Sequence, residues 1–200
     1  MNTLEAIKKR RSIRNYDPTF KISNEEIEEL IKLAMLSPTS YNIQHWKFVV
    51  ISNSKLRNEI KKAAYDQAQV TDASSLILVV TDIKAWEKNM FEKWKNVPKE
   101  IGDFMATSAF DFYLNKEQLQ RDEAIRSASF ATQTLVLAAT AKGFSSGVMI
   151  GFDFDKVAEL INLPENYVIS NFVVVGKGIQ DAHSRGGQLP LHDVLIKNKF

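Results

Sequence analysis

Residues 23–51 read SNEEIEELIKLAMLSPTSYNIQHWKFVVI and predict a helix, a polar loop and a strand in direct succession. Ser23 and Glu26 form a capping box, which marks a helix start, and apolar side chains then recur with helical spacing. The side chains on that apolar face are Ile27, Leu30, Ile31 and Ala34. We therefore expect a helix over about 24–36 that ends before Pro38, a loop over 37–42, and a buried strand over 47–51.

The alternation of helices and strands continues along the chain. Periodicity and turn residues predict helices over about 54–65, 117–142 and 154–162, and strands over 76–81, 147–150 and 168–175. No repeat, low-complexity tract or long linker interrupts this order. We therefore expect one domain over residues 1–200, with a mixed sheet that carries helices on both faces.

Three segments depart from this simple pattern. Residues 84–116 hold seven aromatic side chains without one clear period, and we expect this aromatic excursion to cover a pocket. Residues 127–141 carry no charge but are shorter than the roughly 20 residues needed to cross a bilayer, so a buried or dimer-facing helix is expected rather than a membrane span. The last residues, about 176–200, are expected to form an extended arm.

The composition is that of an ordinary globular protein. Of the 200 residues, 44% are hydrophobic and 25% charged, and the 26 basic and 24 acidic side chains leave a formal charge of only +2, which does not demand a nucleic-acid partner. Cysteine is absent and the three histidines lack metal-ligand spacing, so we expect no metal centre, and any redox chemistry must use a bound cofactor. The N-terminus carries no secretory pattern, which favours a cytoplasmic location.

A dense basic run begins the chain. Five of the seven residues 8–14 are lysine or arginine. Alone, such a run is more often a solvated helix end than a binding site. In an extended segment, however, Arg10, Ser12 and Arg14 would point the same way, and guanidinium groups match the geometry of a phosphate. The run is therefore a candidate phosphate site.

Two further motifs admit both a structural and a binding interpretation. Residues 37–46, SPTSYNIQHW, could be a simple turn, but the alternation of Asn42 and Gln44 around Ile43 suits a wall of polar groups facing a polar heterocycle. Residues 147–153, GVMIGFD, predict a strand end and a turn in which Gly151 would let a ligand approach the backbone closely. Asp153 is the expected N-cap of the helix that follows.

Taken in order, residues 10–14, 37–46, 151–153 and 185–191 resemble the motifs of the nitroreductase family, and the match covers nearly the whole chain. The resemblance implies an α+β protein with a three-layer αβα fold, an obligate homodimer with two FMN sites at its interface, and a C-terminal arm exchanged with the partner. It also implies an oxidoreductase that passes hydride from NADH or NADPH through flavin N5 to a small oxidised acceptor, such as a nitroaromatic or a quinone, by ping-pong kinetics.

The resemblance assigns roles by position. The phosphate and ribityl chain would be held by Arg10, Arg11, Ser12, Arg14 and Arg185. The other subunit would supply Pro38, Thr39, Ser40 and Asn42, while Gln44 would contact the ribityl chain or the ring. Gln67 or Gln69 would serve the pyrimidine edge, because a carboxylate at Asp66 cannot donate a hydrogen bond. The backbone of Ile150 and Gly151 would face flavin N5.

The resemblance leaves the acceptor side less defined. The aromatic excursion is expected to govern acceptor choice, with Tyr41, Phe104 and Phe110 as substrate contacts, although ordinary core packing explains any one aromatic nearly as well. No catalytic acid is required from the protein, since the flavin itself carries the hydride. Two alternatives stay open: a non-catalytic FMN carrier or sensor, and a nucleic-acid surface made by the basic N-terminus with residues 197–199, against which the low net charge argues.

Overall fold

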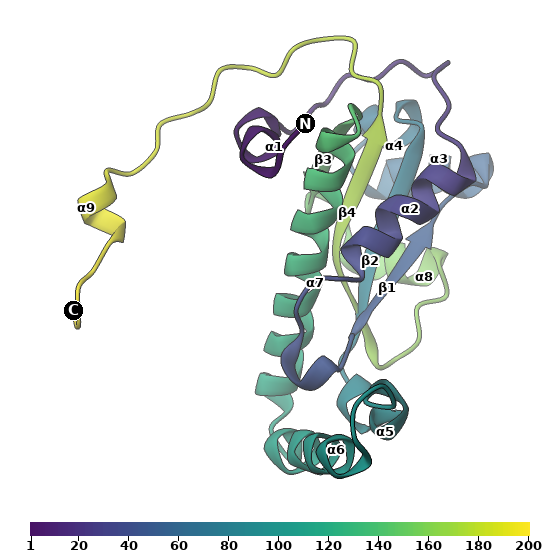
Figure 1. The fold of residues 1–200 in the computed structure, drawn as a ribbon. Coiled ribbons are helices and arrows are strands. Elements are labelled where there is room, and N and C mark those ends of the chain that lie inside the picture. The colour runs from purple at the N-terminus through teal and green to yellow at the C-terminus, as the bar shows by residue number, and fades with distance from the viewer.

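A computed structural model describes residues 1–200, in which a sheet lies between two layers of helices (Figure 1). The strands are β1 (Trp46–Val50), β2 (Ser75–Asp82), β3 (Ser145–Met149) and β4 (Tyr167–Gly176). The helices that cover the two faces are α2 (Asn24–Ala34) and α7 (Glu117–Ala141) on one, and α3 (Ser54–Ala63), α4 (Gln69–Asp72) and α8 (Phe154–Leu160) on the other. The three-layer αβα expectation is confirmed.

The four strands follow the order β1-β2-β4-β3, and every neighbouring pair is antiparallel. The expectation of a mixed sheet is therefore wrong for these strands, and a parallel contact occurs only as the isolated bridge between Ser12 and Ser146. The physical reason is the position of β4. The long helix α7 does connect two strands that run the same way, β2 and β3, but β4 lies between them in the opposite direction.

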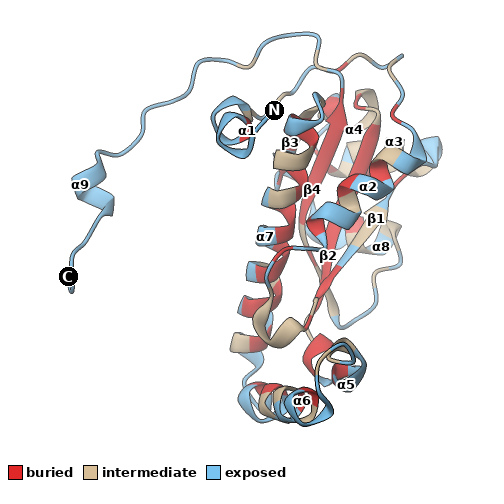
Figure 2. Ribbon diagram, in the orientation of Figure 1, coloured by how far each residue is buried: buried red, intermediate tan, exposed pale blue.

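The sheet buries apolar side chains on both faces because β2 and β4 are central. All eight residues of β2 are buried, and its side chains alternate between two cores. Leu76, Leu78 and Val80 pack toward α3, α4 and α8, whereas Ile77 and Val79 pack toward α2 and α7. Figure 2 shows the buried residues concentrated on the sheet and on the inner sides of the helices. Alternation of this kind is what a strand covered on both faces requires.

The sequence signals for helix ends are confirmed. The side chain of Ser23 accepts a hydrogen bond from the Glu26 backbone, and the reciprocal bond completes the predicted capping box. Gly143 follows α7 with a φ of +89°, a left-handed conformation that glycine adopts without steric cost. Asp153 caps α8 by accepting from the Lys156 backbone N–H. None of the helices combines the length with the apolar composition that a membrane span requires.

The aromatic excursion contains more helix than the sequence predicts. It comprises the 3-10 turn η2 (Ala85–Glu87), α5 (Met90–Lys93) and the 15-residue α6 (Lys99–Tyr113), and it encloses a small core of its own. That core contains Ile43, Trp86, Met90, Ala106, Ala109 and Tyr113. The helical period is hard to read because α6 buries alanines while leaving Phe104, Phe110 and Phe112 exposed.

The two terminal segments leave the sheet at the same end but differ in how they are held (Figure 1). Helix α1 (Thr3–Lys9) packs near the end of α7. Beyond Gly176 the chain leaves the body as the expected arm, and its only helix is the short α9 (Leu191–Val194). Its apolar side chains are exposed: Leu189, Leu191, Val194, Leu195, Ile196 and Phe200. The arm thus makes no core contact within its own chain.

Candidate functional site

The segment after α1 is extended and lies along the edge of β3. The Ile13 backbone N–H donates to the Ser146 carbonyl at 2.9 Å, and Ser12 pairs with Ser146 as a parallel bridge. Ile13 packs partly against the core, whereas Ser12 and Arg14 on either side of it are exposed. This is the alternation expected of an extended segment, and it turns Ser12 and Arg14 outward together.

Gly147 permits this close approach of two backbones. A Cβ atom at position 147 would lie 2.8 Å from the Ile13 carbonyl oxygen, closer than real Cβ contacts allow. The buried ring of Tyr16 supports the same corner, and burial raises the pKa of its hydroxyl. The glycine in β3 therefore sets the position of the basic segment.

A cavity of about 310 Å³ opens between this segment and the end of β3. It is lined by residues from three separate parts of the sequence: Ser12, Ile13, Arg14, Gln67, Gln69 and the stretch 147–151. The structure thus brings together the first basic motif, the two glutamines and the Ile150–Gly151 turn. Asp66, the acidic residue beside the glutamines, is exposed and does not line the cavity.

The amide groups at this cavity form a connected network. The Gln67 amide N–H donates to the Gly151 carbonyl at 2.8 Å, and the Gln69 amide N–H donates to the Gln67 side-chain oxygen at 3.3 Å. Gln69 is only 5% exposed, so few rotamers are open to it. The network fixes two amides and one backbone turn relative to one another.

The arm closes a second, more basic hollow beside the first. Arg10, Arg11, Arg14 and Arg185 all line a cavity of about 510 Å³, and Asp181 is its only carboxylate. The Arg185 guanidinium donates to the Lys8 carbonyl at 2.7 Å and to the Arg10 carbonyl at 3.1 Å, and Arg11 donates to the His183 carbonyl. None of the four arginines forms an ion pair with a carboxylate. Four unpaired guanidinium groups around one hollow suit a phosphate.

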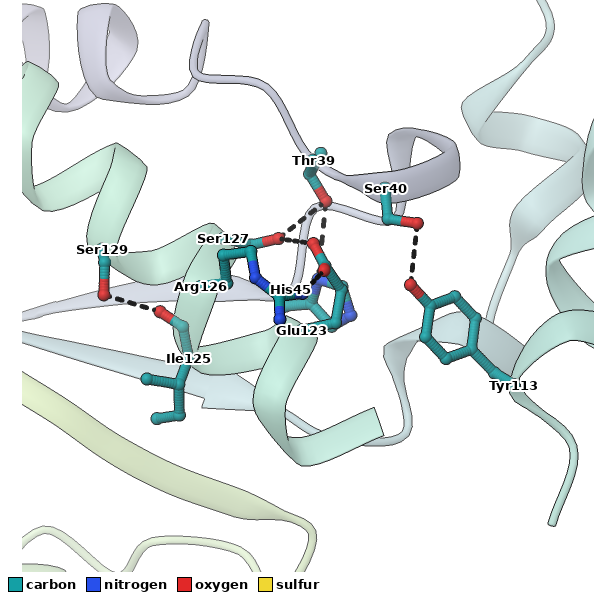
Figure 3. A network of polar contacts seen from close by, with 9 residues as sticks. All are labelled: Thr39, Ser40, His45, Tyr113, Glu123, Ile125, Arg126, Ser127 and Ser129. Carbon is teal, nitrogen blue, oxygen red and sulfur yellow. Dashed lines mark hydrogen bonds and ion pairs between the residues drawn. The ribbon is translucent and has the colours of Figure 1, made fainter. Parts of the chain in front are cut away.

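The 37–46 loop lies far from these arginines within one chain. It contains η1 (Ser40–Asn42) and is bonded to α6 and α7: Ser40 to Tyr113 at 2.7 Å, Thr39 to Ser127 at 3.1 Å (Figure 3). Ser127 and Thr140, which lies near Ile13, are separated by about 20 Å along α7 at 1.5 Å per residue. Pro38, Thr39, Ser40, Asn42 and Gln44 are therefore not assembled with Arg10, Ser12 and Arg14 in the single chain.

The backbone of this loop is strained and held by its own side chains. Tyr41, Asn42 and Gln44 have φ values of 48°, 53° and 54°, a left-handed conformation that costs free energy for residues other than glycine. Asn42 donates to the Lys93 carbonyl at 2.8 Å and accepts from the Gln44 amide at 3.0 Å. Such strain persists only when surrounding contacts hold it in place, which is common at binding sites.

Ionisable groups are buried at this loop, and the sequence does not indicate their burial. His45 is 1% exposed, and burial, assisted by the nearby Lys93, lowers its pKa to about 4. Burial also lowers the pKa of Lys93 to about 8. Glu123 of α7 accepts from Ser127 at 3.1 Å and pairs with Arg126, joining Thr39 to one network (Figure 3). The sequence of the helix alone does not indicate that the Glu123 side chain is buried.

The predicted substrate contacts are not gathered in one cavity. Phe110 lines an apolar hollow of about 670 Å³ together with Trp86 and Met90, but Tyr41 and Phe104 do not. Tyr41 packs instead against Phe112, with ring centroids 5.8 Å apart, and Phe104 is 67% exposed. No group of histidine, aspartate or glutamate side chains is arranged to hold a metal ion.

Comparisons with known proteins cover almost the whole chain. The model of the nitroreductase family matches residues 7–177. Protein DrgA of Synechocystis sp. is 44% identical over 100% of this chain and 97% of its own length, and the oxygen-insensitive NADPH nitroreductase of Helicobacter acinonychis is 26% identical over 95% and 94%. A crystal structure from Exiguobacterium sibiricum, solved in complex with FMN, has a TM-score of 0.91 and 29% identity over 99% of this chain and 98% of its own.

Proposed function

The chain belongs to the nitroreductase family, and on that premise we propose that it is an FMN-dependent enzyme that transfers hydride from NADH or NADPH to a small oxidised acceptor. The observation that carries the proposal is the single cavity that joins Ser12 and Arg14 to the glutamine amides and the Ile150–Gly151 turn. The Helicobacter relative is named for NADPH and nitro-group reduction, and the Exiguobacterium structure contains FMN.

The two ends of the cavity system fit the two ends of FMN. Arg10, Arg11, Arg14 and Arg185 offer donors for a terminal phosphate, and Ser12 offers a hydroxyl beside it. At the other end, the amides of Gln67 and Gln69 are neutral donors and acceptors suited to the pyrimidine edge of the ring. A terminal phosphate monoester together with a ring edge is the pattern of FMN rather than of FAD.

The protein's part in the reaction is to bind and orient. FMN, when bound, supplies the group that accepts a hydride from the donor and returns it to the acceptor. Because Gly151 has no side chain, a bound ring could approach its backbone closely, and the backbone of Ile150 and Gly151 would face flavin N5. The cavity is lined by no carboxyl, imidazole or phenol group that could act as a proton donor, so we propose orientation rather than acid catalysis as the contribution of its side chains.

We further propose that the working site is shared between two chains. The strained 37–44 loop carries polar side chains that lie about 20 Å along α7 from the arginines, and a second copy could bring its own loop to them. The exposed apolar arm provides surface for such a partner to cover. The acceptor would then meet aromatic side chains of the excursion, and Phe110, Phe104 and Tyr41 stay the proposed contacts although one cavity does not gather them.

Steady-state kinetics test the proposal. If one flavin site serves donor and acceptor in turn, NADH or NADPH oxidation with a nitroaromatic or a quinone should give parallel double-reciprocal lines. Intersecting lines would indicate a ternary complex and a separate nicotinamide site. Absence of any turnover by the FMN-loaded protein, across both donors and both acceptor classes, would instead identify a carrier or sensor.

A further inference from the structure

Arg57, in the middle of α3, is bonded to the end of a neighbouring short helix. Its Nε donates to the Val70 carbonyl at 2.5 Å, one Nη donates to the Ser74 carbonyl at 3.2 Å, and the other Nη donates to the Ala73 carbonyl. These carbonyls belong to the last turn of α4 and to the two residues after it. One side chain therefore satisfies three acceptors that a helix end would otherwise leave without partners.

Helix α4 depends on tertiary contacts, and the bonds from Arg57 are a large part of them. It has only four residues, and a single turn is not stable in water because nucleation is costly. Val70 and Ala73 bury their side chains in the core. Arg57 is itself partly buried, and desolvation lowers the pKa of its guanidinium, although the nearby Asp72 acts in the opposite direction. Hydrogen bonds from a charged donor are among the stronger ones, and a partly buried guanidinium loses more when they are broken.

The segment that Arg57 holds carries the two cavity amides. Gln69 is the first residue of α4, and its carbonyl accepts from the Ala73 backbone at 3.3 Å. The Gln67 carbonyl accepts from the Val70 backbone at 3.1 Å. Each residue that presents an amide to the cavity is thus joined by one backbone hydrogen bond to a residue that Arg57 holds. Arg57 itself does not line the cavity.

We propose that Arg57 is a positioning residue for the flavin ring, which acts by holding residues 67–74 so that the Gln67 and Gln69 amides face the cavity. The inference rests on the proposed function, since it concerns the ring of FMN. A guanidinium is required because it places its donors in a planar fork, whereas a lysine ammonium is a single point that cannot reach three separate carbonyls. A lysine at position 57 would keep the positive charge but should therefore fail to hold residues 67–74 in place.

The test compares Arg57→Lys with two control variants on the same helix. Lys55→Met removes an exposed charge from α3, and Ile60→Val removes a methyl group from the core beneath it, so that stability falls while the Arg57 bonds remain. For each protein, the dissociation constant of FMN is measured by flavin fluorescence well below the unfolding temperature. The reduction potential of bound FMN and the hydrogen exchange of residues 67–74 in the FMN-free protein are measured in parallel.

Arg57→Lys is expected to weaken FMN binding about tenfold, a change of about 1.4 kcal/mol, and to shift the potential of bound FMN to more negative values, because the amide donors near the ring are no longer fixed. Exchange of residues 67–74 should accelerate in the FMN-free protein. The two controls should change neither affinity nor potential. If Arg57→Lys lowers thermal stability but leaves affinity and potential at their original values, Arg57 is structural only and the inference is wrong.

A double-mutant cycle separates this inference from the proposed function. If Arg57 acts through the amides, Arg57→Lys should cost little more in a Gln67→Ala, Gln69→Ala background, whereas its effect should add fully to that of Arg14→Ala. Full additivity with the glutamine changes would overturn the inference while leaving FMN binding intact. Failure of the unaltered protein to bind FMN would overturn the proposed function itself, and the exchange data would still report whether Arg57 fixes the segment.

Discussion

At the residue scale, Gly147 determines where the basic segment lies. The Ile13 carbonyl oxygen would be 2.8 Å from a Cβ at position 147, and the oxygen belongs to backbone that cannot rotate away. We predict that Gly147→Ala displaces residues 12–14, costs about 1–3 kcal/mol of stability and weakens FMN binding at least tenfold. Isothermal titration with FMN measures the change in affinity. Gly102→Ala, where an added Cβ would crowd Trp94 at 3.3 Å in the aromatic excursion, is the control, and equal FMN affinities in the two variants would contradict the prediction.

His45 gives the fold a dependence on pH. Its pKa falls from an ordinary 6.5 to about 4 because burial disfavours the charged ring, with Lys93 adding to the effect. Between pH 6.5 and 4, the unfolded chain therefore binds a proton at His45 more readily than the folded chain does. The contribution of the neutral His45 to the free energy of unfolding is fully present above this range and is lost as the pH falls through it. The difference between the two pKa values corresponds to a change in the free energy of unfolding on the order of 3 kcal/mol.

Thermal unfolding of the FMN-free protein between pH 7 and pH 4 checks this expectation. The midpoint should fall with pH, and His45→Gln should flatten the decline. A decline that is as steep in His45→Gln as in the unaltered protein would assign the pH dependence to other groups.

At the scale of elements, local signals predicted the parts that local chemistry determines. The Ser23 capping box, the Gly143 stop and the Asp153 cap lie where the sequence places them, because each is decided by a few neighbouring residues. The direction of strand pairing was not predictable in this way, since β4 reaches its place between β2 and β3 only through the tertiary fold. Helix α6 was missed because its exposed aromatics hide the pattern of its buried alanines.

The arm is the element whose role the single chain does not explain. Leu189, Leu191, Val194, Leu195 and Ile196 are 44% to 71% exposed, and burying one such side chain contributes roughly 1.5–3 kcal/mol. We predict that deletion of residues 187–200 yields monomer or aggregate and loses FMN, although Arg185 is retained. Sedimentation and flavin absorbance measure both properties. A truncated protein that remains dimeric and yellow would show that the arm is dispensable.

In the whole molecule, the candidate site divides into two groups of residues that lie about 20 Å apart along α7, one beside Ser127 and one beside Thr140. The sequence could nominate both groups, because arginines, amides and a glycine turn carry recognisable chemistry. It could not show that Arg14, the two glutamines and the Ile150–Gly151 turn share one cavity while the 37–46 loop lies elsewhere, since that depends on how β3, α4 and the N-terminal segment meet. The buried partners of the loop, His45 and Glu123, depend on the same tertiary arrangement.

Anaerobic reduction of the purified protein distinguishes a hydride-transferring flavoenzyme from every alternative. We expect the protein to bind one FMN per chain, NADH or NADPH to bleach the visible absorption of this flavin in the absence of oxygen, and a nitroaromatic or quinone added afterwards to restore it. Each half of the cycle is observed separately, so binding, reduction and reoxidation are all tested in one cuvette. A protein that takes up no FMN, or whose bound FMN neither donor can bleach, would contradict the account.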